Sequence, residues 1–275
     1  MPITGRDSTG QFEWVKITGR DATGLFEWVK ATGRDNTGLY EWTFGGKLYT
    51  ASHGSRSAGE LYELDRNTGV ATKVANRPGF GVREYNPGGM AWDGTNLYMA
   101  GTNEILYTVN FETGLATRVG RDSLNRPING MVWDGTNLLS VSDENNVIRA
   151  LDRTTGGYQS GGPAYQVPSG SLGSPSSLAW DGATLYATQY GTSAALYTVD
   201  IAGRRVSKVG TAIQFGAGIR SPQGLTWDGT TLLMVDTVID ALFSVDRNTG
   251  IATRIGNADR FGVNLGQVTS LVWVQ

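Results

Sequence analysis

Four aspartates recur at one position of a repeated motif, and their carboxylates could bind a metal ion. Each follows a tryptophan and precedes a glycine, and they are Asp93, Asp134, Asp181 and Asp228. Asp-Gly is also a strong signal for a two-residue hairpin turn, because both turn positions need positive φ. An aspartate in such a turn accepts hydrogen bonds from nearby backbone amides. Because the motif places the four on separate repeats, we predict structural turns rather than a metal site.

The other residue types give little basis for catalysis. The chain has one histidine, His53, and no cysteine. A histidine base needs a carboxylate to orient it, and the neighbours Ser52, Gly54 and Ser55 supply none. The absence of cysteine excludes disulfides, zinc–thiolate sites and thiol catalysis. We therefore predict a protein that is not an enzyme, with no catalytic residues, no cofactor and no bound metal.

Charge and hydropathy exclude two further classes of partner. The chain has 23 basic and 25 acidic residues, a net charge of −2, which does not suit binding to a phosphate backbone. No apolar run reaches the roughly 18 residues of a membrane span. The start, Met1-Pro2-Ile3-Thr4-Gly5, lacks the basic and apolar regions of a signal peptide. The compartment stays open, with a weak preference for an extracellular or cell-surface location.

The elements that carry the aspartates are short strands in an internal repeat. Gly89-Met90-Ala91-Trp92-Asp93-Gly94-Thr95-Asn96-Leu97-Tyr98 is the clearest copy of its first half. Further on come an apolar strand such as Leu242-Phe243-Ser244-Val245-Asp246 and a Thr-Gly turn. The tryptophans of successive copies stand at positions 42, 92, 133, 180, 227 and 273. Four strands in roughly 46 residues predict the blade of a β-propeller, with Trp92, Trp133, Trp180 and Trp227 in the core between blades.

The first residues carry a different repeat, of period 14, with copies at residues 3–16, 17–30 and 31–44. Two architectures follow for the single propeller domain that we expect over residues 1–275. In the favoured one, residues 1–39 and the last strand, at Trp273, form a sixth blade and so join the two ends of the ring. In the alternative, five blades form, the strands at Trp42 and Trp273 compete for one place, and the N-terminal hairpins project as an assembly segment.

The repeat resembles a group of bacterial tandem β-propeller repeat proteins. Their pattern of Trp-Asp-Gly-Thr followed by Thr-Gly-x-Ala-Thr is similar to residues 89–120 and 225–256. The resemblance extends over roughly residues 40–275 and implies the propeller fold. It implies no particular activity, because propellers host many functions.

Candidate binding residues lie where the sequence varies between repeats, since loops carry function more often than strands do. The connections from the last strand of one blade to the first strand of the next share one face, opposite the Asp-Gly and Thr-Gly turns. Arginine and aromatic residues in these connections are typical of binding sites: Arg83, Tyr85, Arg126, Tyr165, Arg220 and Arg260. The N-terminal repeats add candidate assembly residues: Phe12, Trp14, Phe26 and Trp28.

These observations favour a non-enzymatic binding or structural propeller, as a self-assembling extracellular or filament subunit joined by strand addition. Its partner would be another copy or another protein. The alternative is a lectin-like propeller that binds glycans between blades. A propeller hydrolase or lyase ranks lower, and so does a designed sequence with no natural function, which the near-identical repeats would also fit.

Overall fold

The computed structural model describes residues 14–20, 26–30, 46–53, 59–75, 79–83, 86–168, 172–257, 259–263, 265 and 267–275. The chain forms two compact units, residues 47–274 and residues 1–46 together with Gln275. In the second of these, two strands are described, β1 (Trp14–Arg20) and β2 (Phe26–Lys30), and they form an antiparallel two-stranded sheet.

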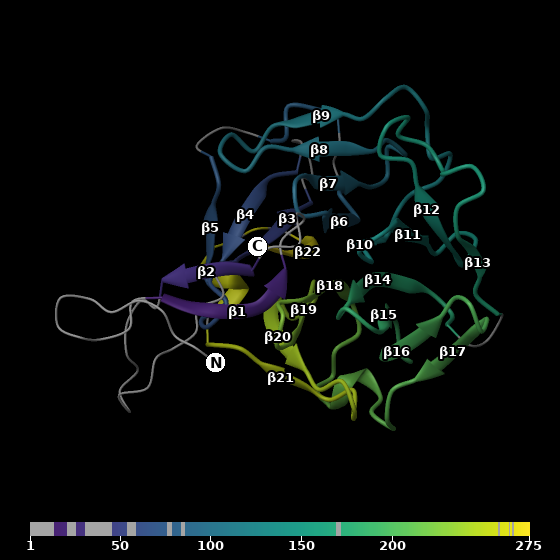
Figure 1. The fold of residues 1–275 in the computed structure, drawn as a ribbon. Helices are drawn as coiled ribbons and strands as arrows, with labels where there is room; N and C mark the ends of the chain where they lie inside the picture. The colour runs from purple at the N-terminus through teal and green to yellow at the C-terminus, as the bar shows by residue number, and fades with distance from the viewer. Residues whose placement is uncertain are drawn as a thin grey trace. The chain divides into compact units, whose positions relative to one another are not determined.

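Residues 47–274 form a β-propeller of five blades, each an antiparallel sheet of four strands (Figure 1). Four blades use strands that are consecutive in the chain. Blade 1 consists of β6 (Gly89–Trp92), β7 (Leu97–Ala100), β8 (Tyr107–Val109) and β9 (Ala116–Arg118). Blade 2 consists of β10 (Gly130–Trp133), β11 (Leu138–Ser142), β12 (Val147–Leu151) and β13 (Ala164–Gln166).

Blades 3 and 4 follow in the same order along the chain. Blade 3 consists of β14 (Pro175–Trp180), β15 (Leu185–Gln189), β16 (Ala195–Asp200) and β17 (Arg205–Lys208). Blade 4 consists of β18 (Pro222–Trp227), β19 (Leu232–Asp236), β20 (Ala241–Val245) and β21 (Ala252–Arg254). Two short 3-10 helices, η1 (Gln214–Gly216) and η2 (Asp259–Gly262), lie in the connections that follow these blades.

Blade 5 combines strands from opposite parts of the chain. The last strand, β22 (Val268–Val274), pairs with β3 (Lys47–Ser52), which is followed by β4 (Leu61–Leu64) and β5 (Ala71–Lys73). The sixth blade that we favoured is therefore wrong. The strand at Trp273 completes the blade begun at Lys47, so β1 and β2 are not needed in any blade. The competing strand expected at Trp42 lies outside the described residues.

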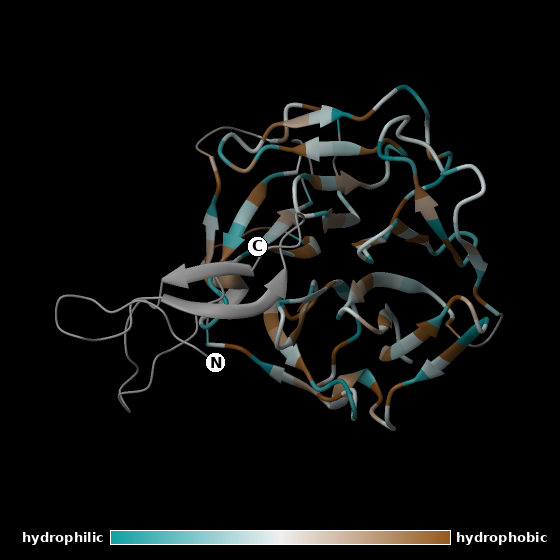
Figure 2. Ribbon diagram, in the orientation of Figure 1, coloured by the Kyte–Doolittle hydropathy of each residue, from teal (hydrophilic) through white to brown (hydrophobic). Residues whose placement is uncertain are grey.

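Burial is high in the first two strands of each blade and lowest in the last strand. The second strands are almost wholly buried, whereas the last strands alternate or are mostly exposed. Figure 2 shows hydrophilic residues in the last strands and the turns of the propeller. Short strands rich in Leu, Val, Tyr and Thr suit this half-buried surface. The first strands face the neighbouring blades, and β22 contacts both β18 and β6.

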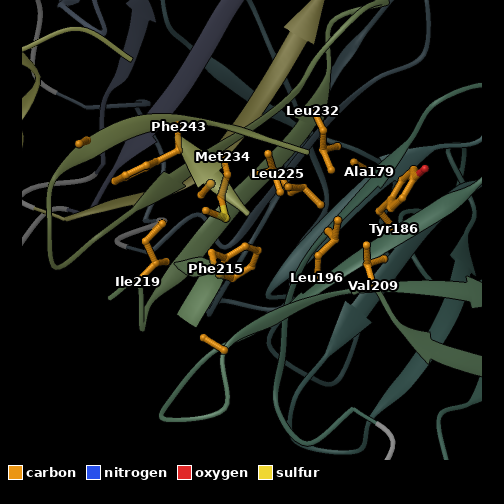
Figure 3. Close-up of a cluster of buried hydrophobic side chains, with 14 residues drawn as sticks. Ala179, Tyr186, Leu196, Val209, Phe215, Ile219, Leu225, Leu232, Met234 and Phe243 are labelled. Atoms are coloured by element: carbon orange, nitrogen blue, oxygen red, sulfur yellow. The ribbon is translucent and has the colours of Figure 1, made fainter. Parts of the chain in front are cut away.

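Five hydrophobic clusters hold neighbouring blades together. The cluster between blades 3 and 4 joins Tyr186 and Leu196 to Leu225, Met234 and Phe243 (Figure 3). Equivalent clusters lie between blades 1 and 2, 2 and 3, 4 and 5, and 5 and 1. Each connection between blades also inserts at least one apolar side chain that is at most 1% exposed, among them Phe80, Leu124, Leu172, Phe215 and Phe261.

Glycine at the start of the first strand permits the close approach of adjacent blades. A Cβ atom on Gly130 would lie 2.6 Å from the Cα of Ser177 in blade 3. One on Gly224 would lie 2.6 Å from the backbone nitrogen of Leu271 in blade 5. Contacts below 3 Å are not tolerated by real side chains, so these positions favour glycine. Ser177 itself accepts a hydrogen bond from the Leu225 amide at 2.9 Å, which links blades 3 and 4.

Candidate functional site

The repeated aspartates lie in hairpin turns, as the sequence predicts, but only the glycine of each Asp-Gly pair has positive φ, so the expected positive φ at the aspartate is wrong. Asp93 Oδ1 accepts hydrogen bonds from the amides of Thr95 at 2.9 Å and Asn96 at 2.7 Å. Gly94 has φ +93°, a conformation that glycine adopts without strain. Asp134, Asp181 and Asp228 accept the same pair of amide hydrogen bonds. One carboxylate oxygen of each aspartate is therefore used locally, and the other is available to a different partner.

In blade 1 that other oxygen binds an arginine from the next blade. Arg153 follows the aspartate of the second turn type, between β12 and β13, and its Nη1 lies 2.5 Å from Asp93 Oδ2. The guanidinium carbon lies 4.4 Å from the ring centroid of Trp133, in the same blade as Arg153. The Asp93 side chain is only 3% exposed. The arginine thus joins two blades while it covers one face of a tryptophan, a favourable cation–π arrangement.

The same arrangement, which we call the arginine latch, occurs at two further interfaces. Between blades 3 and 4, Arg247 pairs with Asp181 and lies 4.4 Å from the Trp227 centroid. Between blades 4 and 5, Arg66 pairs with Asp228 and lies 5.9 Å from the Trp273 centroid. The predicted core tryptophans are partly buried at the edges of the clusters. In a latch, the arginine covers a tryptophan face that the core leaves open.

Two opposing effects act on the carboxylates of the latches. Burial raises the pKa of Asp93, but the amides of Asn96 and Thr95 and the charge of Arg153 outweigh it, so the pKa lies below its ordinary value. Burial likewise raises the pKa of Asp181. Hydrogen bonds from the amides of Thr184 and Ala183 and from Arg247 lower it by more, so the pKa of Asp181 also lies below its ordinary value. Both carboxylates are consequently ionised at neutral pH and are complementary to an arginine.

The interface between blades 5 and 1 has an aromatic residue in place of the arginine. Phe111 stands at the latch position of blade 1 and packs against Trp92 and Tyr49, with centroid distances of 5.4 and 5.0 Å. In blade 5 the residue directly after Trp273 is Val274 rather than an aspartate. A hollow of about 340 Å³ remains beside Phe111. This interface therefore lacks both charges of the latch.

The interface between blades 2 and 3 lacks only the arginine. The turn between β16 and β17 has Ile201 at the latch position, yet Asp134 is retained in blade 2. Asp181 Oδ2 also accepts a hydrogen bond from Tyr186, but the equivalent residue beside Asp134 is Leu139. Among the described residues, Asp134 Oδ2 has one side-chain donor, Asn137 Nδ2 at 3.3 Å, and no ion pair.

A hollow of about 560 Å³ lies at this position, and we call it the blade 2–3 hollow. Its lining includes Asp134 and Leu139 from blade 2 and Trp180 and Ile201 from blade 3. Arg205, an exposed residue at the start of β17, lines it as well. Its volume lies in the range of small-ligand sites, and half of the residues that line it are polar or charged, among them Asp200 and Ser207.

The structure does not gather the predicted loop residues into one site. Arg83 and Arg220 are exposed, and Arg126 is exposed and pairs with Glu144 at 3.1 Å. Tyr165 lies in β13 and is only 3% exposed, so its ring packs in the core between blades 2 and 3. Arg260 lies in η2, where the backbone alone is described, and Tyr85 lies outside the described residues.

The remaining predicted residues lie in the N-terminal unit. Trp14 begins β1, and Phe26 and Trp28 lie in β2, where again only the backbone is described. Phe12 is outside the described residues. Within the described part of the chain, no three acidic or histidine side chains come together as a metal site, and no helix is long and apolar enough to span a membrane.

Sequence reasoning missed the blade 2–3 hollow, although a signal for it is present. The residue after the turn aspartate or asparagine is Arg66, Phe111, Arg153, Ile201 and Arg247 in successive repeats. This one repeat position holds an arginine in three repeats and an apolar residue in two. The two apolar residues mark the interfaces that lack the latch arginine. Which aspartate each arginine meets depends on the order of the blades, which the repeats alone do not show.

No protein-family model matches the chain, and the comparison with curated proteins finds no match. Among solved structures, the chain is similar to one described as "Crystal structure of Nidogen/Laminin Complex", with a TM-score of 0.54 and 13% sequence identity. The similarity covers 84% of this chain and 99% of that chain. At this identity the likeness supports the propeller fold and nothing finer.

Proposed function

We propose that this chain is a non-enzymatic binding module that engages a protein partner at the blade 2–3 hollow. The observation that carries the proposal is that Asp134 lines a hollow at the interface between blades 2 and 3, where the aspartate of the latch is present and the arginine is replaced by Ile201. A partly buried carboxylate beside an aromatic ring and apolar side chains is a favourable anchor site for a partner side chain.

The class of partner follows from the size and composition of the hollow. About 560 Å³ accommodates a long side chain with adjoining atoms, and half of the residues that line the hollow are apolar. The structural neighbour comes from a complex of two proteins, which supports a protein as the partner class. The proposal of binding without catalysis rests on the sequence, which has a single histidine and no cysteine.

A selection with a matched control tests this function. A random peptide library would be selected on the wild-type chain, and the retained peptides tested against the Ile201→Arg variant. This substitution places an arginine at the position where blades 2, 4 and 5 carry the latch arginine, and it should occupy the hollow with a side chain of the protein itself. We expect peptides that bind the wild-type chain and lose binding to I201R. Peptides that bind both equally, or no peptides at all, would overturn the proposal.

We also propose that the pairing of β22 with β3 closes the ring of blades. The supporting contacts are those of β22 with β18 on one side and β6 on the other, and the clusters between blades 4 and 5 and between blades 5 and 1. Ring closure would remove the exposed sheet edges that favour aggregation. It would also fix the spacing of Asp134 and Trp180 across their interface.

Self-association is a second candidate function, favoured by the N-terminal sheet. Within the described residues, β1 and β2 pair only with each other. A two-stranded sheet is marginally stable by itself and gains stability when a further strand adds to it. Sedimentation of the full chain over a wide concentration range tests this, with a rise in mass expected. A constant monomer mass at every concentration would contradict it.

A further inference from the structure

We propose that the blade 2–3 hollow binds a guanidinium group, the side chain of an arginine supplied by a partner protein. The inference rests on the proposed function and specifies the chemistry of the ligand. It derives from a comparison of equivalent interfaces within this one chain.

The occupied latches define the geometry of the missing group. In each, the guanidinium lies between the tryptophan of its own blade and the aspartate of the preceding blade, as Arg247 lies between Trp227 and Asp181. At the blade 2–3 interface the corresponding tryptophan and aspartate are Trp180 and Asp134. Both line the hollow. The two sides of a guanidinium site are thus present without the guanidinium.

The strand register shows that Ile201 occupies the arginine position. Val199 pairs with Val206 in blade 3, and Val245 pairs with Ala252 in blade 4. Counting two residues on from Val199 and Val245 brings Ile201 and Arg247 into equivalence. The Ile201 side chain packs at the edge of the core cluster and ends short of an arginine's reach. It therefore leaves the volume of the guanidinium empty.

The carboxylate at this site has capacity for a cation. Asp134 Oδ1 accepts hydrogen bonds from the backbone amides of Thr136 and Asn137, at 2.8 and 2.6 Å. Its Oδ2 accepts a hydrogen bond of 3.3 Å from Nδ2 of the Asn137 side chain. In the blade 3–4 latch, the equivalent oxygen receives both Arg247 and the Tyr186 hydroxyl. Leu139 replaces that tyrosine, so the hollow offers an anion with less compensation than its counterpart.

Arginine fits this site better than lysine does. A guanidinium is planar, stacks on an aromatic ring and is more weakly hydrated than an ammonium group. Its methylene stem packs on apolar surface while the head reaches the charge, and Leu139, Leu185 and Val199 supply that surface. The positive charge of Arg205 in the lining opposes a cationic ligand, so the Trp180 face and Asp134 must outweigh it.

The test uses N-acetyl-L-arginine amide as the probe and the full chain as the receptor. Binding is followed by NMR, through the chemical shift of the indole N–H of Trp180. This resonance is identified by its absence from the spectrum of the Trp180→Phe variant. We expect a saturable shift with the arginine probe, and binding at least about tenfold weaker with the citrulline analogue, which has the same shape without the charge. Binding by lysine amide should be intermediate.

Variants assign the binding to the proposed groups. Ile201→Arg should abolish the shift and Asp134→Asn should weaken binding about tenfold, whereas Arg205→Gln should keep or strengthen it. Arg247→Ile opens the same arrangement between blades 3 and 4 and should add a second site that shifts the Trp227 indole. Equal binding of citrulline, undiminished binding by I201R, loss of binding in R205Q, or no second site in R247I would each overturn the proposal.

This experiment fails independently of the peptide selection. If I201R-sensitive peptides are found without an essential arginine, the guanidinium inference is wrong and the binding function stands. If the arginine probe binds but no peptide depends on the hollow, the ligand chemistry stands and the protein-binding function is wrong.

Discussion

Arg247 lies 4.4 Å from the ring centroid of Trp227 in its own blade and forms an ion pair with Asp181 of the preceding blade. The Asp181 side chain is 5% exposed, while that of Arg247 is 41% exposed. The arginine therefore shields a nearly buried carboxylate from the solvent side. This relationship, repeated at three interfaces and broken at two, connects the stability of the propeller to its proposed binding site.

Removing the arginine from an intact latch should destabilise the chain. Arg247→Ile leaves the Asp181 carboxylate nearly buried without its cation, which we expect to lower the free energy of unfolding by about 1–3 kcal/mol. Urea denaturation measures the change. The matched control is Arg126→Gln, because the Arg126–Glu144 pair has both side chains more than 40% exposed, and exposed pairs contribute less than about 1 kcal/mol. An equal effect of the two substitutions would contradict the latch.

Completing the missing latch should have the opposite effect. Ile201→Arg supplies Asp134 with a partner and covers Trp180, and we expect the free energy of unfolding to rise by about 1 kcal/mol. Ile251→Arg is the control, because it adds the same charge at an exposed turn position, 48% exposed, outside the latch. Thermal melting should rise for I201R alone. A decrease for I201R would show that the hollow cannot hold a guanidinium.

Acid should weaken the propeller through its turn aspartates. The pKa values of Asp93 and Asp181 are lowered in the folded chain, and those of Asp65, Asp152 and Asp246 are lowered chiefly by backbone amides. A lowered folded-state pKa contributes stability that is complete above the unfolded value and is lost as pH falls through the folded value. Unfolding midpoints in urea should therefore fall below about pH 4. An unchanged midpoint from pH 7 to pH 3 would contradict this account.

Loss of the C-terminal strand should abolish cooperative folding. β22 places Val268, Leu271 and Val272 in the clusters on both sides of blade 5. A chain that ends before Val268 should give no single unfolding transition. Leu271→Ala, a smaller change at a residue 3% exposed, should cost about 2–5 kcal/mol, against little change for Val263→Ala at an exposed site. A truncated chain that unfolds at the wild-type midpoint would contradict ring closure by β22.

The repeat alone was sufficient to predict the propeller and its turns. Asp-Gly after each tryptophan predicts a hairpin, and the amide hydrogen bonds of Asp93 and Asp181 follow from local chemistry. The number of blades could not be settled in this way. The N-terminal repeats and the last strand suggested a sixth blade, but β22 pairs with β3, which lies more than 200 residues earlier in the sequence. Pairings between the two ends leave no local pattern.

The candidate site was beyond sequence reasoning for a related reason. Ile201 by itself gives no signal of a site, and Asp134 stands in the same Trp-Asp-Gly motif as three other aspartates. Their significance depends on the order of the blades, which sets blade 3 beside blade 2 and thus Trp180 beside the same hollow as Asp134. The loop residues chosen by type illustrate the converse: Tyr165 has the chemistry of a binding residue, yet its 3% exposure places it in the core.

A crystal structure of the chain grown with N-acetyl-L-arginine amide would test the central claim most directly. We predict density for the guanidinium over the face of Trp180, with a nitrogen in hydrogen-bond contact with Asp134 Oδ2, in the position that Arg247 takes between Trp227 and Asp181. A hollow that stays empty while the probe binds elsewhere, or one filled by the chain's own Arg205, would contradict it.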